Sequence, residues 1–213
     1  MATMNVVQAF TVIHTDSHLV VAHKDAGLLT VPAYEEPCMV DLLEAELDRH
    51  QFGRFRLAVV HRLDRQTSGL LVFARSPPMA AALAKQFAAH QVEREYIAIV
   101  AGRLSEADGT LRYPLAGKRA VTHFKTLTRR EDSTVVAVRL ETGRRTQIRA
   151  HFAEKGHPVI GDTRFKPDRA QHVRWPHARL ALHARTLGFV HPASRKPLRF
   201  EDPTPVTFKE FLS

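Results

Sequence analysis

The sequence of 213 residues contains only one cysteine, Cys38, so no disulfide bond can form within the chain. A single thiol in a chain of this length is typical of a reducing compartment, and we expect a cytoplasmic protein. No apolar run reaches the ~20 residues that a membrane-spanning helix needs. Residues 1–9 also lack the charged start and apolar core of a secretory signal. The sequence therefore predicts no membrane partner.

Acidic residues are scarce in one region only. The formal net charge is +9, and the range from Arg139 to Arg199 holds 14 Lys or Arg residues against 4 Asp or Glu residues. The rest of the chain has 17 basic and 18 acidic residues and is close to neutral. Many basic stretches are only solvated surface, but an excess confined to one region favours a face that binds nucleic acid.

The chain lacks internal repeats and low-complexity tracts, and 44% of its residues are hydrophobic, so it can bury one sizeable core. The residue pattern predicts helices at 39–50, 77–91 and 204–212. Alternating and β-rich runs predict strands at 10–14, 18–23, 94–102 and 134–140. Interspersed strands and helices are typical of the α+β class, which is the fold class that we expect.

The stretch from His61 to Gly69 lies between two apolar runs, 57–60 and 70–74, which both predict buried strands. Asp64 is therefore expected on a loop that two core strands hold in place. An Asp that is flanked by arginines is more often an exposed ion pair than a catalytic group. A carboxylate that a nearby Arg keeps ionised can also act as a nucleophile.

The residues from His61 to Leu70 resemble the motif His-Arg-Leu-Asp-x-x-Thr-Ser-Gly-Leu of the RluA-type pseudouridine synthases. In that family the Asp of this motif is catalytic, which implies that Asp64 is the nucleophile. The resemblance implies an isomerase that moves the ribose bond of uridine from N1 to C5 and needs neither a metal nor an organic cofactor. The base must leave its stack to react, so the implied partner is an RNA stem-loop with a flipped uridine.

A second motif resembles the family at Arg94–Gly102, where the family has Lys/Arg-x-Tyr-x-Ala-x-Val-x-Gly. The resemblance places Tyr96 in the uracil pocket, where its ring would stack on the base and its hydroxyl would relay a proton. A Tyr on a strand is otherwise most often core packing.

A third motif, Leu140–Phe152, resembles the family form Thr-Gly-Arg-x-His-Gln-Ile/Leu-Arg, with a helix that begins near Gln147. The resemblance implies that Arg149 pairs with the catalytic Asp64. Thr146 stands where the family usually has His, and Gly143 would allow a sharp turn before the helix. The residues that we expect to contact RNA are Arg62, Arg65, Arg144, Arg145 and Gln147.

Further segments extend the resemblance to about residues 10–210. Residues 111–115 resemble a strand followed by a loop, 120–125 resemble a strand, and 156–162 resemble a structural turn. The basic stretch 164–180 is a candidate RNA-contacting loop. The implied fold is a mixed, mostly antiparallel sheet flanked by helices, with a central catalytic cleft. We expect one catalytic domain over 1–213, without an N-terminal accessory RNA-binding domain, acting as a monomer on ribosomal or transfer RNA.

Two alternatives stay open at this point. A catalytically silent RNA-binding or assembly protein on the same fold would be indicated by loss of Asp64, Tyr96 or Arg149, and all three are present. A metal-dependent RNA hydrolase would need clustered Asp, Glu or His ligands, and His61 with Asp64 alone is too little. Adding EDTA to an activity assay would separate hydrolysis from isomerisation.

Overall fold

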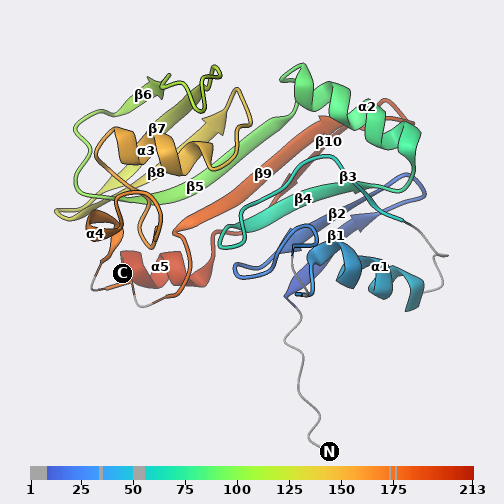
Figure 1. Cartoon of the computed structure of the whole chain (residues 1–213), viewed down its shortest axis with the longest axis horizontal. Coiled ribbons are helices and arrows are strands. Elements are labelled where there is room, and N and C mark those ends of the chain that lie inside the picture. Colours follow the sequence, from blue (N-terminus) through green and yellow to red (C-terminus); the bar gives the residue numbers. More distant parts are fainter. Residues whose placement is uncertain (1–8, 34–35, 50–55, 173, 176) are drawn as a thin grey trace, which may run out of the picture.

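The computed structural model describes residues 9–33, 36–49, 56–172, 174–175 and 177–213 (Figure 1). Its strands are β1 (Phe10–Thr15), β2 (Leu19–Lys24), β3 (Ala58–Val59), β4 (Ser68–Ala74), β5 (Glu93–Ala101), β6 (Asp108–Leu111), β7 (Thr122–Arg129), β8 (Ser133–Leu140), β9 (Leu182–Val190) and β10 (Pro197–Glu201). Its helices are α1 (Met39–Arg49), α2 (Pro77–Ala88), α3 (Gln147–Glu154), α4 (Pro167–Ala170) and α5 (Val206–Leu212).

The strands form one long curved sheet in the order β1-β2-β4-β9-β5-β8-β7-β6, with β3 beside β4 and β10 beside β9 (Figure 1). Most neighbours run antiparallel, but β4 and β9 run parallel through Ser68 opposite His183 and Gly69 opposite Ala184. This short pairing joins the half of the sheet built from β1, β2 and β4 to the half that begins at β9. The expected mixed, mostly antiparallel α+β architecture is confirmed.

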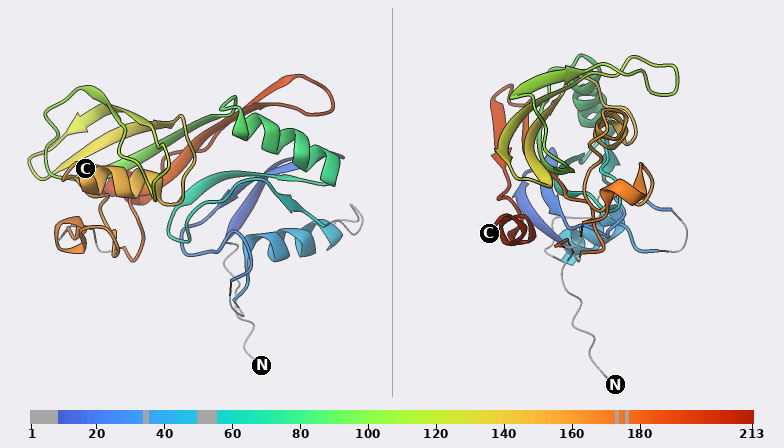
Figure 2. Two further views of the ribbon diagram at one scale, coloured as in Figure 1. Left: turned by 45° about the horizontal axis from the view of Figure 1, so that its top comes forward. Right: turned by 90° about the vertical axis from the view of Figure 1, so that its left-hand side faces the viewer.

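Strand β4 is buried on both faces, which explains its unbroken apolar run. Leu71 and Phe73 pack into the large core that also contains α1, whereas Leu70 and Val72 pack on the other face against Leu83 of α2. Helices α1 and α2 therefore cover opposite faces of this half of the sheet. Helices α3 and α5 lie at the other half (Figures 1 and 2).

Gly69 is required by the parallel contact between β4 and β9. Its φ is +116°, a region that side chains disfavour, and a Cβ added there would lie 2.2 Å from the carbonyl oxygen of Ala184. Only a residue without a side chain lets the two backbones come this close. Gly69 thus sets the position of the loop that carries Asp64 against the second half of the sheet.

Most predicted elements are confirmed to within a few residues, including the helices α1, α2, α3 and α5. The predicted last residue of α1, His50, lies outside the described residues. The expectation of a buried strand at 57–60 was too strong, because β3 has two residues and Val59 is 38% exposed. The segment 111–115, expected as a strand followed by a loop, begins at the last residue of β6 (Asp108–Leu111) and continues as a loop. The stretch 164–180 contains the short helix α4. No helix in the described part of the chain is long and apolar enough to cross a membrane.

Candidate active site

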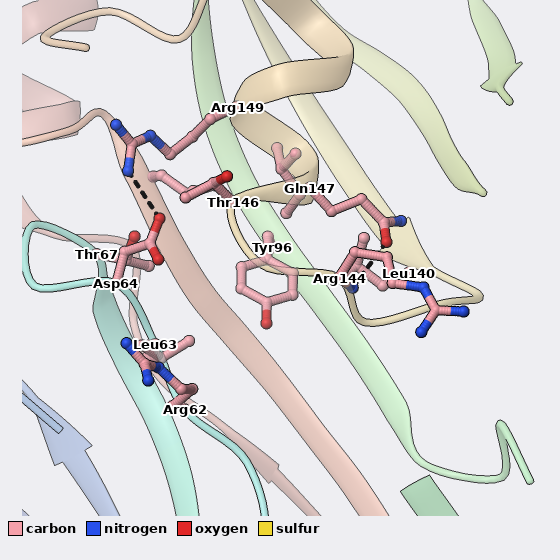
Figure 3. Close-up of a pocket in the computed structure, with 12 residues that line it drawn as sticks. Arg62, Leu63, Asp64, Thr67, Tyr96, Leu140, Arg144, Thr146, Gln147 and Arg149 are labelled. Atoms are coloured by element: carbon pink, nitrogen blue, oxygen red, sulfur yellow. Dashed lines mark hydrogen bonds and ion pairs between the residues drawn. The ribbon is translucent and has the colours of Figure 1, made fainter. Parts of the chain in front are cut away.

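The candidate site lies where the two halves of the sheet meet. Asp64 stands on the loop that leads into β4, Tyr96 on β5, and Arg149 in the first turns of α3 (Figure 3). All three line one pocket, so residues that are far apart in the sequence share a small space. The three motifs of the sequence therefore converge on one place in the fold.

Arg149 joins two carboxylates of different exposure. Its Nη1 donates to Asp64 Oδ2 at 2.8 Å, while Nε and Nη2 donate to the two oxygens of Asp162 at 2.7 and 2.9 Å (Figure 3 for the Asp64 pair). The side chain of Asp162 is fully buried, and that of Asp64 is 22% exposed. The paired guanidinium is thus fixed from behind by Asp162 and presents its remaining edge to Asp64.

Asp162 is a site residue that the sequence did not reveal. Burial raises the pKa of its carboxyl group, but hydrogen bonds from Arg149 and from the backbone N–H groups of Arg164 and Phe165 outweigh burial and lower the pKa below its usual value. The segment Gly156–Asp162 had been interpreted only as a turn. No local sequence pattern pairs Asp162 with Arg149, because the contact forms only where the turn folds back onto α3.

The backbone of the Asp64 loop is held by two buried side chains from other segments. Thr30 donates its hydroxyl to the carbonyl of Leu63 and accepts from the N–H of the same residue, at 3.0 and 3.3 Å. Lys24 Nζ donates to the carbonyl oxygens of Asp25, Leu28 and Arg65. Burial lowers the pKa of Lys24 to about 7. These contacts fix the loop on both sides of Asp64.

His61 has a structural place in the same motif. Its ring stacks on Phe87 of α2 with centroids 4.6 Å apart, and its Nε2 accepts a hydrogen bond from the Val72 N–H at 3.1 Å. A ring nitrogen that accepts is unprotonated, and burial, together with the charge of Arg94, lowers the pKa of His61 to about 3. His61 is therefore neutral at physiological pH and braces the loop against α2.

Tyr96 contributes a ring and a hydroxyl to the pocket. The residue is 9% exposed, and Figure 3 shows its ring beside Asp64 and Thr146. Burial and, less strongly, the nearby carboxylate of Asp64 raise the pKa of the Tyr96 hydroxyl, while Arg94 opposes them. The hydroxyl is consequently protonated at neutral pH, with a hydrogen to donate.

Gln147 departs from the expected RNA contact. Its Oε1 accepts from the Thr142 hydroxyl and the Arg144 N–H, and its Nε2 donates to the Val121 carbonyl and the Thr122 hydroxyl. The residue is 2% exposed, and all four hydrogen-bonding positions of its amide are occupied. Gln147 thus shapes the start of α3, and we no longer count it among the groups that contact RNA.

The turn into α3 is made at Thr146. This residue has φ 54°, a left-handed conformation that costs about 1–2 kcal/mol for a residue with a side chain. Gly143, which we expected to make the turn, is not in that region; a Cβ there would instead lie 2.6 Å from Nη1 of Arg94. Gly143 therefore provides space for an arginine side chain, and Thr146 carries the strain at the mouth of the pocket.

Three of the predicted RNA-contacting arginines face open space beside the pocket. Arg62, Arg144 and Arg145 are exposed and line a cleft of about 620 Å³ that also borders Asp64 and Tyr96. Among the described residues neither Arg62 nor Arg145 has a recorded side-chain hydrogen bond, and Arg144 bonds only the Arg119 carbonyl. Their charges are available to a ligand.

Arg65 is placed differently. Its guanidinium forms an ion pair with Glu36 at 2.7 Å and donates to the carbonyl oxygen of Gly27, and it borders neither the pocket nor the larger cleft. The two arginines on either side of Asp64 in the sequence therefore have different surroundings, and a turn closed by the Thr67 N–H and the Asp64 carbonyl lies at Arg65.

Comparison with known proteins assigns the class. Residues 18–154 match the model of the RNA pseudouridylate synthase family, and the chain belongs to this family. It is an isomerase that converts uridine to pseudouridine in RNA. This membership excludes the hydrolase reading and speaks against a silent binding protein.

The relatives point to the RluA type. The chain is 37% identical to "Ribosomal large subunit pseudouridine synthase D" of Zymomonas mobilis over 91% of this chain and 69% of the relative. It is 34% identical to "Dual-specificity RNA pseudouridine synthase RluA" of Pasteurella multocida, over 90% and 92%. The solved structure of human RNA pseudouridylate synthase domain containing 4 superposes with a TM-score of 0.80 at 25% identity, covering 94% of this chain and 91% of that one.

Proposed function

We propose that Asp64 is the nucleophile of the isomerisation, that Arg149 holds it ionised and aimed, and that Tyr96 stacks on the target base. The observation that carries this proposal is the ion pair of 2.8 Å between Arg149 and Asp64 inside a pocket that Tyr96 also lines. A carboxylate with one oxygen bound to a fixed guanidinium keeps its other oxygen for attack.

The chemistry assigns a task to each group. Asp64 attacks the ribose C1′ or C6 of the ring, the bond between N1 and the ribose breaks, and the freed base turns so that C5 bonds to C1′. The bond to the Asp64 oxygen then breaks, which regenerates the carboxylate. The hydrogen on C5 leaves and N1 gains one, so the reaction is balanced without an external reagent. The protonated hydroxyl of Tyr96 is suited to assist this proton transfer.

The substrate is a uridine in structured RNA, and the names of the relatives favour ribosomal RNA. The Zymomonas relative is named for the large ribosomal subunit and the Pasteurella relative for dual specificity, so transfer RNA is the second candidate. The exposed arginines Arg62, Arg144 and Arg145 would contact phosphates of a stem-loop that presents a flipped uridine. Arg65, bound to Glu36, is the weakest of the four candidates.

The remaining parts of the proposal concern organisation. One sheet connects all site residues, which supports a single catalytic domain, and one copy of the chain supplies Asp64, Tyr96 and Arg149, which supports a monomer. An RNA substrate and a single buried thiol, Cys38, fit a cytoplasmic enzyme.

The test is the substitution Asp64→Asn, which keeps the shape of the side chain and removes its charge. Pseudouridine is mapped in total RNA from cells that lack the gene and carry either wild type or the variant. We expect one or a few positions to disappear without the gene and to return with wild type only. The purified variant should still bind RNA, and isomerisation by folded Asp64→Asn would refute the assigned nucleophile.

A further inference from the structure

Arg94 is a buried cation without a carboxylate partner among the described residues. The residue is 8% exposed, its Nε is buried with no hydrogen bond, and Nη2 reaches the Glu141 carbonyl oxygen only at 3.5 Å. The guanidinium carbon lies 5.6 Å from the centroid of the Phe87 ring. No described carboxylate forms an ion pair with it.

The neighbouring acids on β5 are engaged elsewhere. Glu93 pairs with Arg199 and Glu95 pairs with Arg185, at 3.1 and 3.7 Å. Burial lowers the pKa of Arg94, but a guanidinium remains charged at neutral pH. Buried charges are normally paired because desolvation is costly, so this position is complete only when an anion arrives from outside.

The guanidinium borders the same cleft of about 620 Å³ as the reactive groups. Arg62, Arg144 and Arg145 also line this cleft, and the one carboxylate among its described lining residues, Asp64, is already bound to Arg149. The cleft wall is therefore strongly positive, and its chemical complement is a group such as a phosphodiester.

Gly143 fixes the place of the Arg94 side chain at the cleft. A Cβ at Gly143 would lie 2.6 Å from Nη1, so only a glycine lets the guanidinium pack against the loop before α3. Arg94 and Tyr96 lie two residues apart on one strand and border the cleft together, about 7 Å from each other along β5. A base stacked on Tyr96 would bring its backbone close to Arg94.

We propose that Arg94 forms the floor of a phosphate subsite, which binds the phosphodiester next to the flipped uridine. This rests on the proposed function and adds a fixed position for the RNA backbone. The other arginines of the cleft are exposed, whereas Arg94 is buried between Phe87 and the loop before α3. Arg94 would thus set the register of the RNA relative to Tyr96.

The test measures binding of a fluorescein-labelled oligouridylate of ten nucleotides as salt is varied, with wild type, Arg94→Met and Arg139→Met. Arg139 lies in β8 opposite Glu95, is exposed and does not border the cleft, so it is the matched control. For Arg94→Met we expect binding weaker by about tenfold or more, and a slope of log Kd against log salt smaller by about 0.7. Arg139→Met should match wild type within about twofold.

Two further measurements separate a phosphate contact from a structural role. Melting curves verify folding, and Arg94→Gln replaces Arg94→Met if the latter does not fold. On an oligouridylate with uncharged methylphosphonate linkages, wild type and the neutral variant should bind equally. An unchanged salt slope in a folded neutral variant would overturn the subsite. The subsite would also be wrong if the neutral variant lost as much affinity, relative to wild type, on the uncharged RNA as on the charged RNA.

The binding assay does not depend on turnover, so its outcome is independent of the Asp64 proposal. If wild type converts no uridine yet the salt slope depends on Arg94, the function assigned to Asp64 is wrong and the subsite stands. If wild type is active and the slope ignores Arg94, only the subsite is wrong.

Discussion

Arg149 directs most of its hydrogen bonds to Asp162, a buried residue that does not line the pocket. Two of its three bonds go to the buried Asp162, and one goes to Asp64. The carboxylate of Asp162 is itself held by two backbone N–H groups. Asp162 is consequently a positioning residue, because it orients the guanidinium that in turn orients the proposed nucleophile.

Substituting Asp162 should therefore damage both stability and turnover. Asp162→Asn leaves the Arg149 charge without its buried counterion, and we expect a loss of about 3 kcal/mol in the free energy of unfolding. Single-turnover isomerisation should slow by about 10- to 100-fold because Arg149 is no longer fixed. Asp168→Asn, on the exposed first turn of α4, is the control and should change neither quantity. Wild-type turnover in folded Asp162→Asn would contradict the positioning role.

The same pair predicts a dependence on pH. The pKa of Asp162 in the folded chain is below its usual value of 3.8, so its stabilisation is complete above that value and is lost as the pH falls below it. The difference in unfolding free energy between wild type and Asp162→Asn should be constant between pH 5 and 8, within about 0.5 kcal/mol, and should shrink below pH 4. Urea unfolding at several pH values measures this difference, and a gap that widens in acid would refute the sign.

At the scale of elements, the parallel contact between β4 and β9 is the narrowest link in the main strand order from β1 to β6. Two residue pairs define it, and Gly69 contributes the close approach to the carbonyl of Ala184. Both strands are buried along most of their length. A change at this link is transmitted directly to the loop that carries Asp64.

Gly69→Ala should prevent stable folding. The added Cβ would overlap backbone rather than a flexible side chain, and we expect a loss of at least about 4 kcal/mol. Gly117→Ala is a matched control, because Gly117 has φ +71° but nothing within 4 Å of an added Cβ. It should cost only the conformational strain, about 1–2 kcal/mol. Urea unfolding compares the two, and equal losses would show that the close approach is not the cause.

The sequence predicted individual strands better than it predicted which strands lie side by side in the sheet. The apolar run 70–74 and the alternation at 94–102 identified β4 and β5 because local pattern reflects burial. Strand β9 lies between them in the sheet although it follows them by more than 80 residues in the chain, and no local pattern encodes that insertion. The function of Asp162 and the inward-facing amide of Gln147 also depend on such long-range contacts, so they were missed or misjudged.

For the whole molecule, the uneven charge indicates how RNA approaches. The stretch 164–180 begins directly behind the ion pair of Asp64 and Arg149. The N–H groups of Arg164 and Phe165 bind Asp162, and the Phe165 ring lies 5.3 Å from the guanidinium carbon of Arg149. Its exposed basic side chains therefore extend the positive surface outward from the site.

Reversing charge in this stretch should affect binding more than chemistry. We expect the double variant Arg164→Glu and Lys166→Glu to raise KM for RNA about tenfold or more, with kcat changed less than about twofold, because the contacts are to the RNA backbone. The control is Arg195→Glu with Lys196→Glu, two exposed basic residues in the turn between β9 and β10. Steady-state kinetics on one transcript measures KM and kcat for both double variants. An equal rise in KM for both would indicate a general effect of charge and would contradict a specific contact at 164–180.

The link between β4 and β9 has one more consequence. Asp64 belongs to one half of the sheet, and Tyr96 and Arg149 belong to the other, so their spacing is set by backbone pairing rather than by adjustable side chains. A slip of one residue would move the carboxylate by about 3.4 Å, more than the 2.8 Å that separates it from Arg149. The pairing of the two strands therefore fixes the distance from Asp64 to Tyr96 and Arg149 before any RNA is bound.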